Sequence, residues 1–157
     1  MEASTGCSHM KVLFDVNVVI DIWGNTDDFA ESYQAFDIAL FKNFEPCVTS
    51  SMAPSIVYLL SARKYLPRKE SRDAFGSIME IAETLDVIDA DCRCARESDM
   101  ADFEDALIAY TAKRHEVDFI VTRNKADFAH SPVPAMTPAE FVGLYRPTCL
   151  EYEMVDL

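Results

Sequence analysis

The sequence predicts an α/β protein, a three-layer α/β/α sandwich built around a central parallel sheet. Short apolar runs typical of buried strands alternate along the chain with longer segments whose apolar residues recur every three or four positions, as on one face of a helix. No repeat, low-complexity tract or Pro/Gly/Ser-rich linker interrupts residues 11–146. Because strands that alternate with helices form parallel sheets covered on both faces, we expect one domain over these residues.

Strand and helix signals alternate through the whole domain. In the first half they predict a strand over 11–14, a helix over 28–44, a strand over 46–49 and a helix over 53–65. In the second half they predict a helix over 70–84, a strand over 87–89, a helix over 102–114, strands over 119–122 and 134–136, and a final helix from Thr137. Thr137 followed by Pro138 is the usual pairing of a helix N-cap with proline at the first helical position.

Composition and charge exclude several classes of protein. The chain has 157 residues, 50% of them hydrophobic, which suffices for one complete core. Its formal net charge of -13 argues against a general phosphate-binding surface, because nonspecific affinity for nucleic acids comes largely from Lys and Arg. The same charge favours basic partners and divalent cations. No apolar run approaches the ~20 residues that a membrane-spanning helix requires.

The ends of the chain and its cysteines suggest a cytoplasmic protein. Residues 1–10 lack the regions of a secretory signal, and we expect a disordered segment, native or in part an expression remnant ending in SHM with Met10 as the natural start. We expect residues 147–157 to form a C-terminal tail. The five cysteines lack the spacing of a disulfide framework, which indicates reduced thiols. A soft metal held by Cys92 and Cys94 is the alternative.

Carboxylates follow separate strands at what should be one edge of the sheet. Asp15 comes directly after the first strand, Asp102 and Asp105 share the first turn of a late helix, and Asp127 lies beyond the fourth strand. In parallel sheets, ligands bind at the carboxyl ends of the strands. Such carboxylates repel one another, and Mg²⁺ or Mn²⁺ is the simplest neutraliser. A metal held there can activate water and stabilise charge on a phosphodiester, as in metal-dependent nucleases.

Three motifs carry a resemblance to a known family. They are FDVNVVID at 14–21, DFEDALIAYTAKR at 102–114 and VDFIVTRNKADF at 117–128. In this order and spacing they closely resemble the PIN-domain family, including the VapC-like ribonuclease toxins of bacterial toxin–antitoxin systems. The resemblance covers roughly residues 11–143. It implies an α/β/α fold with a Mg²⁺ or Mn²⁺ site that cuts RNA, an antitoxin protein as partner, and dimers as a frequent assembly.

The resemblance also implies roles for individual residues. By position, the metal ligands would be Asp15, Asp105 and Asp127, and the supporting residues would be Asp102, Asn17, Thr122 and Asn124. One position departs from the family pattern, since PIN domains usually carry an acid early in the helix after the second strand. Aligning SSMAPSIVYLL places Ser55 there, and neither Glu45 nor Glu70 is placed to replace the acid. A serine offers a neutral oxygen, so metal affinity should be lower.

Simpler structural roles exist for the same residues. Asp15 could serve as a helix N-cap, Asp102 and Asp105 could be first-turn acids favoured by the helix dipole, and Asp127 could be a turn residue. We expect Asp21 to lie on the helix after Asp15 and to face solvent or Lys11. The motif residues therefore have both a structural and a functional interpretation.

Four further hypotheses follow from these features. With Ser55 in place of an acid, the chain could be a catalytically weakened PIN-like module that binds RNA or protein. A phosphotransferase of the haloacid-dehalogenase type also starts with an aspartate after the first strand, but its second aspartate would fall at Asn17. A basic antitoxin tail could place an Arg or Lys in the acidic pocket and compete with the metal. The aromatic helix predicted over 28–44 could form a homodimer interface.

Overall fold

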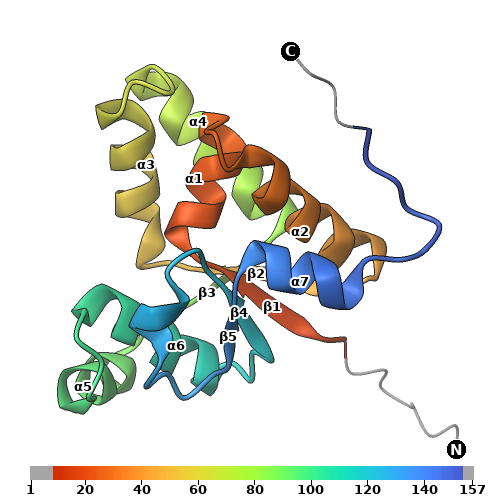
Figure 1. Cartoon of the computed structure of the whole chain (residues 1–157). Coiled ribbons are helices and arrows are strands. Elements are labelled where there is room, and N and C mark those ends of the chain that lie inside the picture. Colours follow the sequence, from red (N-terminus) through yellow and green to blue (C-terminus); the bar gives the residue numbers. More distant parts are fainter. Residues whose placement is uncertain (1–8, 154–157) are drawn as a thin grey trace, which may run out of the picture.

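The computed structural model describes residues 9–153, which contain a five-stranded parallel sheet with helices on both faces (Figure 1). The strands are β1 (Lys11–Phe14), β2 (Glu45–Thr49), β3 (Glu83–Leu85), β4 (Phe119–Val121) and β5 (Ala135–Met136). Their order across the sheet is β3-β2-β1-β4-β5, and every neighbouring pair is parallel. The predicted fold class is confirmed. Residues 1–8 and 154–157, which include most of the expected disordered segment, lie outside the described residues.

Within residues 9–153, seven α-helices and one short 3₁₀ helix surround the sheet. They are α1 (Val16–Gly24), α2 (Phe29–Phe41), α3 (Met52–Ala62), α4 (Arg68–Ile81), α5 (Asp89–Glu97), α6 (Phe103–Arg114), η1 (Lys125–Phe128) and α7 (Pro138–Tyr145). Helices α5 and α6 pack together on one face, α1, α2 and α7 cover the other, and α3 and α4 form a hairpin at the upper left of Figure 1. No helix within residues 9–153 is both long enough and apolar enough to cross a membrane.

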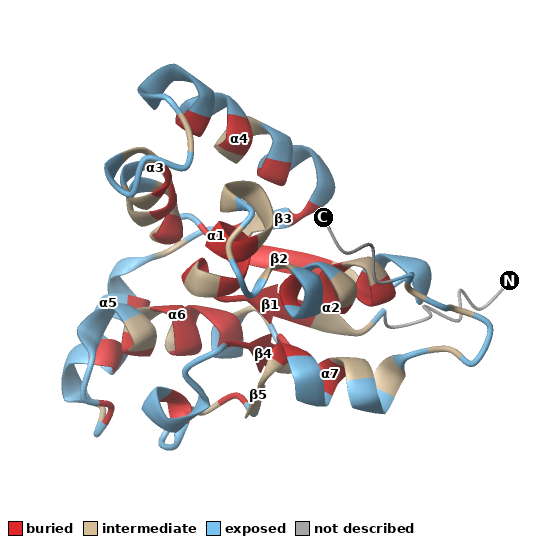
Figure 2. Cartoon of the chain, turned by 45° about the horizontal axis from the view of Figure 1, so that its top comes forward, coloured by how far each residue is buried: buried red, intermediate tan, exposed pale blue. Residues whose placement is uncertain are grey.

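The core lies between the sheet and its two helical layers (Figure 2). Val12, Leu13 and Phe14 of β1 are completely buried, as expected for a central strand covered on both faces. The ring of Phe14 contacts Phe36 of α2 and Phe141 of α7, with centroid distances of 4.9 and 6.4 Å. These contacts attach both helices to the strand that leads into the candidate site.

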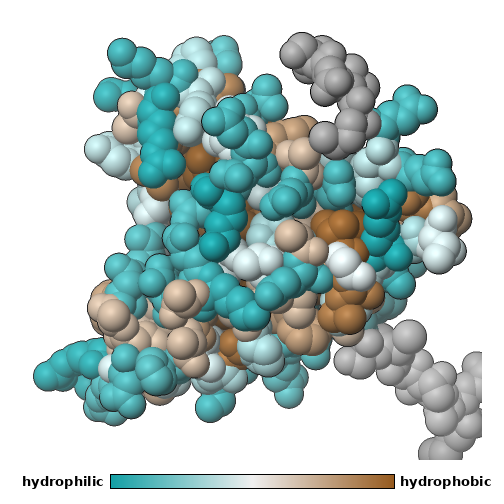
Figure 3. Space-filling model, viewed as in Figure 1, coloured by the Kyte–Doolittle hydropathy of each residue, from teal (hydrophilic) through white to brown (hydrophobic). Residues whose placement is uncertain are grey.

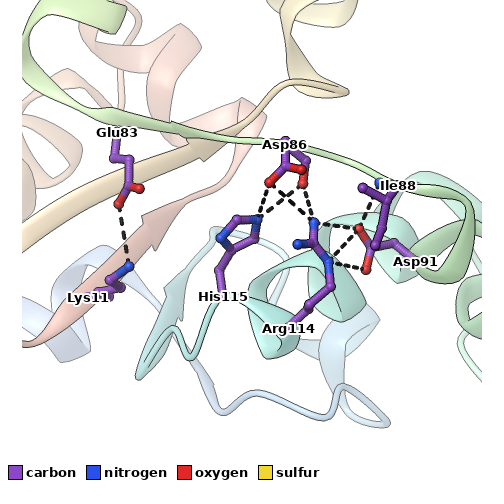
Figure 4. Close-up of polar contacts among 7 residues, drawn as sticks. All are labelled: Lys11, Glu83, Asp86, Ile88, Asp91, Arg114 and His115. Carbon is purple, nitrogen blue, oxygen red and sulfur yellow. Dashed lines mark hydrogen bonds and ion pairs between the residues drawn. The ribbon is translucent and has the colours of Figure 1, made fainter.

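The third strand lies earlier in the chain than we predicted, and the helix after it was missed. We expected a strand over 87–89, whereas β3 ends at Leu85. Figure 4 shows the cause: Asp91 accepts a hydrogen bond from the backbone N of Ile88 at 3.0 Å and lies 2.9 Å from Arg114 Nε. These contacts start α5 directly after Ile88 and attach it to α6, so the chain turns away from the sheet.

The other predicted elements are all present, with ends shifted by a few residues. The final helix begins as expected. Thr137 Oγ1 accepts a hydrogen bond from the backbone N of Glu140 at 3.2 Å, and Glu140 Oε2 accepts one from the backbone N of Thr137 at 2.9 Å. This reciprocal cap satisfies two backbone donors at the start of α7.

Asp21 is buried, and our expectation that it would face solvent or Lys11 was wrong. Its side chain is 0% exposed. It accepts hydrogen bonds from Ser32 Oγ of α2 at 2.7 Å and Thr26 Oγ1 at 2.6 Å, and it lies 2.8 Å from Arg123 Nε. The carboxylate therefore ties α1 to α2 and to the loop after β4. Its partners all lie outside α1, and Arg123 is about a hundred residues away in the chain, so the spacing along α1 could not reveal them.

Replacement of Asp21 by alanine should lower the free energy of unfolding by about 3 kcal/mol, because two hydroxyls and a guanidinium lose their buried acceptor. Urea denaturation followed by circular dichroism measures this change. Asp27→Ala is the matched control, since Asp27 is exposed in the loop between α1 and α2. That substitution should change the free energy by less than about 0.5 kcal/mol. Equal losses in the two variants would contradict the structural role of Asp21.

Candidate functional site

An acidic cavity of about 380 Å³ lies at the carboxyl edge of the sheet, where β1 and β4 end. Its lining residues are Asp15, Val16, Asn17, Ser55, Tyr58, Leu59, Asp102, Glu104, Asp105, Asn124 and Asp127. They come from the starts of α1 and α6, from α3, and from the loop that contains η1. Every predicted site residue lines this cavity except Thr122. The structure thus brings together side chains from four separate parts of the sequence.

Both oxygens of the Asp15 carboxylate are held in place. Asp15 follows β1 and is the N-cap of α1, and its Oδ1 accepts a hydrogen bond from the backbone N of Val16 at 2.7 Å. Its Oδ2 accepts one from Thr122 Oγ1 at 2.8 Å. Burial raises the pKa of Asp15, and these two hydrogen bonds oppose that effect. Asp15 is therefore both a helix cap and a cavity residue, and Thr122 acts on the cavity through it.

The first turn of α6 contributes further carboxylates. Asp102 is the N-cap of this helix, and its Oδ1 accepts a hydrogen bond from the backbone N of Asp105 at 3.0 Å. Burial, followed by the charges of the nearby carboxylates Asp15, Asp102 and Asp127, raises the pKa of Asp105 to about 7. At neutral pH, Asp105 is thus partly protonated unless positive charge enters the cavity.

Glu104 also lines the acidic cavity, although we did not predict it. Ser55 on α3 donates a hydrogen bond from its Oγ to Glu104 Oε1 at 2.7 Å. Glu45 and Glu70, which the sequence already indicates are not placed to replace the missing acid, do not line the cavity. The carboxylate beside Ser55 comes instead from α6. The motif DFED contained the signal, because Glu104 directly precedes Asp105 in the same helical turn.

The loop after β4 brings Asn124 and Asp127 to the cavity. The backbone N of Asn124 donates to Thr122 Oγ1 at 3.1 Å, and the backbone N of Asp127 donates to Asn124 O at 3.0 Å. Asp127 lies in η1 and is exposed. It is therefore a turn residue, as in the simpler interpretation, and a cavity residue as well. Arg123, between Thr122 and Asn124, is bound to Asp21 and does not line the cavity.

The donor set of the acidic cavity fits a hard divalent cation. Five carboxylates, two hydroxyls and two amide side chains offer oxygen, which Mg²⁺ and Mn²⁺ prefer. Within residues 9–153, no three Asp, Glu, His or Cys side chains lie close enough to hold an ion by themselves. Mg²⁺ commonly binds one or two carboxylates and keeps several waters, so water would complete its shell here. Cys92 and Cys94 are exposed free thiols.

The comparison with known families decides the classification. The sequence matches the PIN domain profile over residues 11–126, well over half of the chain. The chain belongs to the PIN-domain family. Among curated proteins, none matches it significantly.

Solved structures share the fold of this PIN domain. A chain of VapBC2 from Rickettsia felis, bound to a DNA fragment from its promoter, is 17% identical with a TM-score of 0.65, and the match covers 82% of this chain and 98% of that chain. A chain of VapBC-1 from nontypeable Haemophilus influenzae is 13% identical with a TM-score of 0.62, and the match covers 83% of this chain and 99% of that chain. A chain of DNA-bound VapBC from Salmonella typhimurium is 18% identical with a TM-score of 0.59, and the match covers 82% of this chain and 98% of that chain. At such identities the likeness establishes the fold alone.

The raised pKa of Asp105 predicts a pH-dependent effect on stability in EDTA. Because the folded PIN domain binds this proton more tightly than the unfolded chain, the free energy of unfolding should fall as pH rises from about 4 to about 7. Asp105→Asn should therefore stabilise the protein at pH ~8 by about 1 kcal/mol, allowing for solvent screening. At pH ~3.5 it should have little effect. Urea titrations at the two pH values measure the difference in the free energy of unfolding. An equal increase at both pH values would contradict the link between protonation of Asp105 and stability.

Proposed function

We propose that the protein is a divalent-metal-dependent endoribonuclease that hydrolyses RNA phosphodiester bonds, and that it is the toxin component of a type II toxin–antitoxin system. The observation that carries the proposal is the acidic cavity, where five carboxylates gather at the carboxyl edge of a PIN-domain sheet. The toxin role is supported by the similar fold of chains from VapBC complexes.

In the proposed site, Asp15, Asp105 and Asp127 would hold Mg²⁺ or Mn²⁺, one or two of them directly and the rest through water. When bound, the cation lowers the pKa of water and offsets charge that develops on the phosphodiester. A cation held there would offset the carboxylate charges that, after burial, raise the pKa of Asp105. The buried Asp15 carboxylate keeps its orientation because its two oxygens accept separate hydrogen bonds.

The supporting residues fix these ligands or face the substrate. Asp102 holds the first turn of α6 through the backbone N of Asp105. Thr122 orients Asp15 and also accepts from the backbone N of Asn124. The amides of Asn17 and Asn124 line the cavity, where they can hydrogen-bond phosphate or ribose oxygens. Glu104 supplies the carboxylate that Ser55 lacks.

Asp15→Asn should abolish metal-dependent cleavage and leave the circular dichroism spectrum unchanged, because asparagine keeps the shape of the side chain and removes its charge. The measurement is cleavage of a mixed RNA pool by wild type with Mn²⁺, with Mg²⁺ and with EDTA, beside the variant prepared identically. Retained cleavage by Asp15→Asn would refute the assignment of this cavity as the active site.

Glu104→Gln should weaken Mn²⁺ binding about tenfold, because the number of charged groups near an ion sets its affinity. Isothermal titration calorimetry measures the dissociation constant. Glu80→Gln is the matched control, since Glu80 is exposed on α4 and does not line the cavity. Ser55→Glu, which restores an acid on α3, should strengthen binding. If Glu104→Gln and Glu80→Gln bind Mn²⁺ equally well, Glu104 does not replace the missing acid.

A second candidate function is a PIN-like module that binds RNA or protein without cleaving it, and Ser55 is the residue that favours it. Weak metal binding would leave the cavity without its catalytic ion. Absence of Mn²⁺ binding at millimolar concentration, together with no RNA cleavage, would select this function over the nuclease.

An antitoxin is the proposed protein partner, and the cytoplasm is the proposed location. The acidic cavity, in a chain of net charge -13, would attract an Arg or Lys from a basic segment that competes with the metal. A homodimer is proposed through α2, where Tyr33, Leu40 and Phe41 are 42%, 42% and 55% exposed. Large apolar side chains exposed together often mark interfaces.

A further inference from the structure

The basic residues of this acidic chain are concentrated in one segment. Of its 14 Lys and Arg residues, five lie within residues 63–72, and the same stretch holds one acid, Glu70. The five are Arg63, Lys64, Arg68, Lys69 and Arg72. None of them forms an ion pair with any residue in the described range 9–153, whereas Lys11, Arg93, Arg114, Arg123 and Lys125 all do. Their charge is available to a ligand. We name residues 63–72, which join α3 to α4, the basic turn.

A second cavity, of about 500 Å³, opens beside the basic turn. Its lining residues are Tyr58, Ser61, Ala62, Lys64, Leu66, Pro67 and Arg68. We name it the basic cavity because Lys64 and Arg68, both exposed, are its charged residues. Tyr58 lines this cavity and the acidic cavity alike. The two cavities therefore meet at one aromatic side chain.

One face of α3 connects the two cavities. Ser55 lines the acidic cavity, Tyr58 lines both, and Ala62 lines the basic cavity. Steps of three and four residues place these side chains on the same side of the helix, over a length of about 10 Å. The Tyr58 side chain is 67% exposed between them. Single-stranded nucleic acids bind to surfaces of this kind, where bases stack on aromatic rings and phosphates contact basic groups.

The backbone of the basic turn is held firmly. The backbone N of Lys64 donates to Ser61 O at 3.1 Å, and that of Leu66 donates to Leu60 O at 3.0 Å. Tyr65 packs so closely on Gly24 of α1 that a Cβ there would lie 2.9 Å from the ring. The turn therefore presents its basic side chains from a fixed position. Figure 2 shows the outer end of the hairpin as exposed, and Figure 3 shows hydrophilic side chains over it.

We propose that Tyr58 and the basic cavity form a subsite for the single-stranded RNA that flanks the scissile phosphate. A base stacks on Tyr58, and backbone phosphates pair with Lys64 and Arg68. The inference rests on the proposed nuclease function and adds to it how the substrate is held. Because the chain is acidic overall, a polyanion needs a local source of attraction, and the basic turn supplies it next to the acidic cavity.

The test measures binding of a fluorescein-labelled 2′-O-methyl oligouridylate, about twelve nucleotides long, by anisotropy in EDTA. Neither metal nor cleavage contributes under these conditions. The double variant Lys64→Ala/Arg68→Ala should bind at least about tenfold more weakly. The negative slope of the logarithm of the association constant against the logarithm of salt concentration should become less steep by about 1.4. Lys42→Ala/Lys113→Ala removes the same charge near the amino edge of the sheet. This control should change affinity by less than about twofold.

Two substitutions of Tyr58 test stacking separately from charge. Tyr58→Ala should weaken binding about tenfold, within the range that stacked bases contribute. Tyr58→Phe should bind like the wild type, because it keeps the ring and loses only the hydroxyl. An equal loss in both variants would overturn the stacking role of Tyr58.

The outcomes also separate this inference from the proposed function. If removal of Lys64 and Arg68 leaves oligouridylate affinity unchanged, or if the control pair weakens it equally, the subsite is overturned and the basic turn fits an acidic polypeptide instead. Metal-dependent cleavage combined with that result would preserve the nuclease and reject the subsite. Binding that depends on Lys64 and Arg68, without cleavage by metal-loaded wild type, would support the subsite and reject the nuclease.

Discussion

Mutual repulsion among the carboxylates of the acidic cavity is the constraint on which the rest of the structure depends. Five acids from distant positions line one cavity, and one of them, Asp15, is 3% exposed. A buried carboxylate is costly unless hydrogen bonds or opposite charge compensate it. Thr122 and Val16 provide the hydrogen bonds for Asp15, while burial and then the charges of the neighbouring carboxylates raise the pKa of Asp105. The packing of β1 in the core must offset the repulsion among these carboxylates.

The contact between Arg123 and the buried Asp21 stabilises the loop that lines the acidic cavity. Arg123 lies between Thr122 and Asn124, so its attachment to α1 fixes the loop that carries both residues. Its charge also acts on Asp15, where it opposes the effect of burial on the pKa. Because the guanidinium is bound to Asp21, this stabilisation does not place a cation inside the cavity. The acids therefore keep their attraction for an external ion.

Signals that are local in the sequence predicted most of the fold and of the site. Apolar periodicity located the strands and helices, and the carboxyl ends of parallel strands had to meet, which brought Asp15, Asp105 and Asp127 together. Contacts between distant segments were not predictable in this way. Asp21 of α1 accepts a hydrogen bond from Ser32 of α2, and Glu104 of α6 accepts one from Ser55 of α3. Strand β3 was misplaced because Glu83 and Thr84 are polar, and its pairing with β2 decides its position.

Ser55 has a second consequence when the proposed metal site and the proposed RNA subsite are considered together. Taken alone, it lowers the charge available to a metal. On α3, however, Ser55 lies one turn from Tyr58, on the face that leads from the basic cavity to the acidic one. An acid at this position would repel a nucleic-acid strand that follows that face. With Glu104 contributing the carboxylate from α6, the cavity keeps its charge, and α3 itself adds no acid between the two cavities. Under the two proposals, the metal ligands lie outside α3, and the path of the RNA strand follows α3.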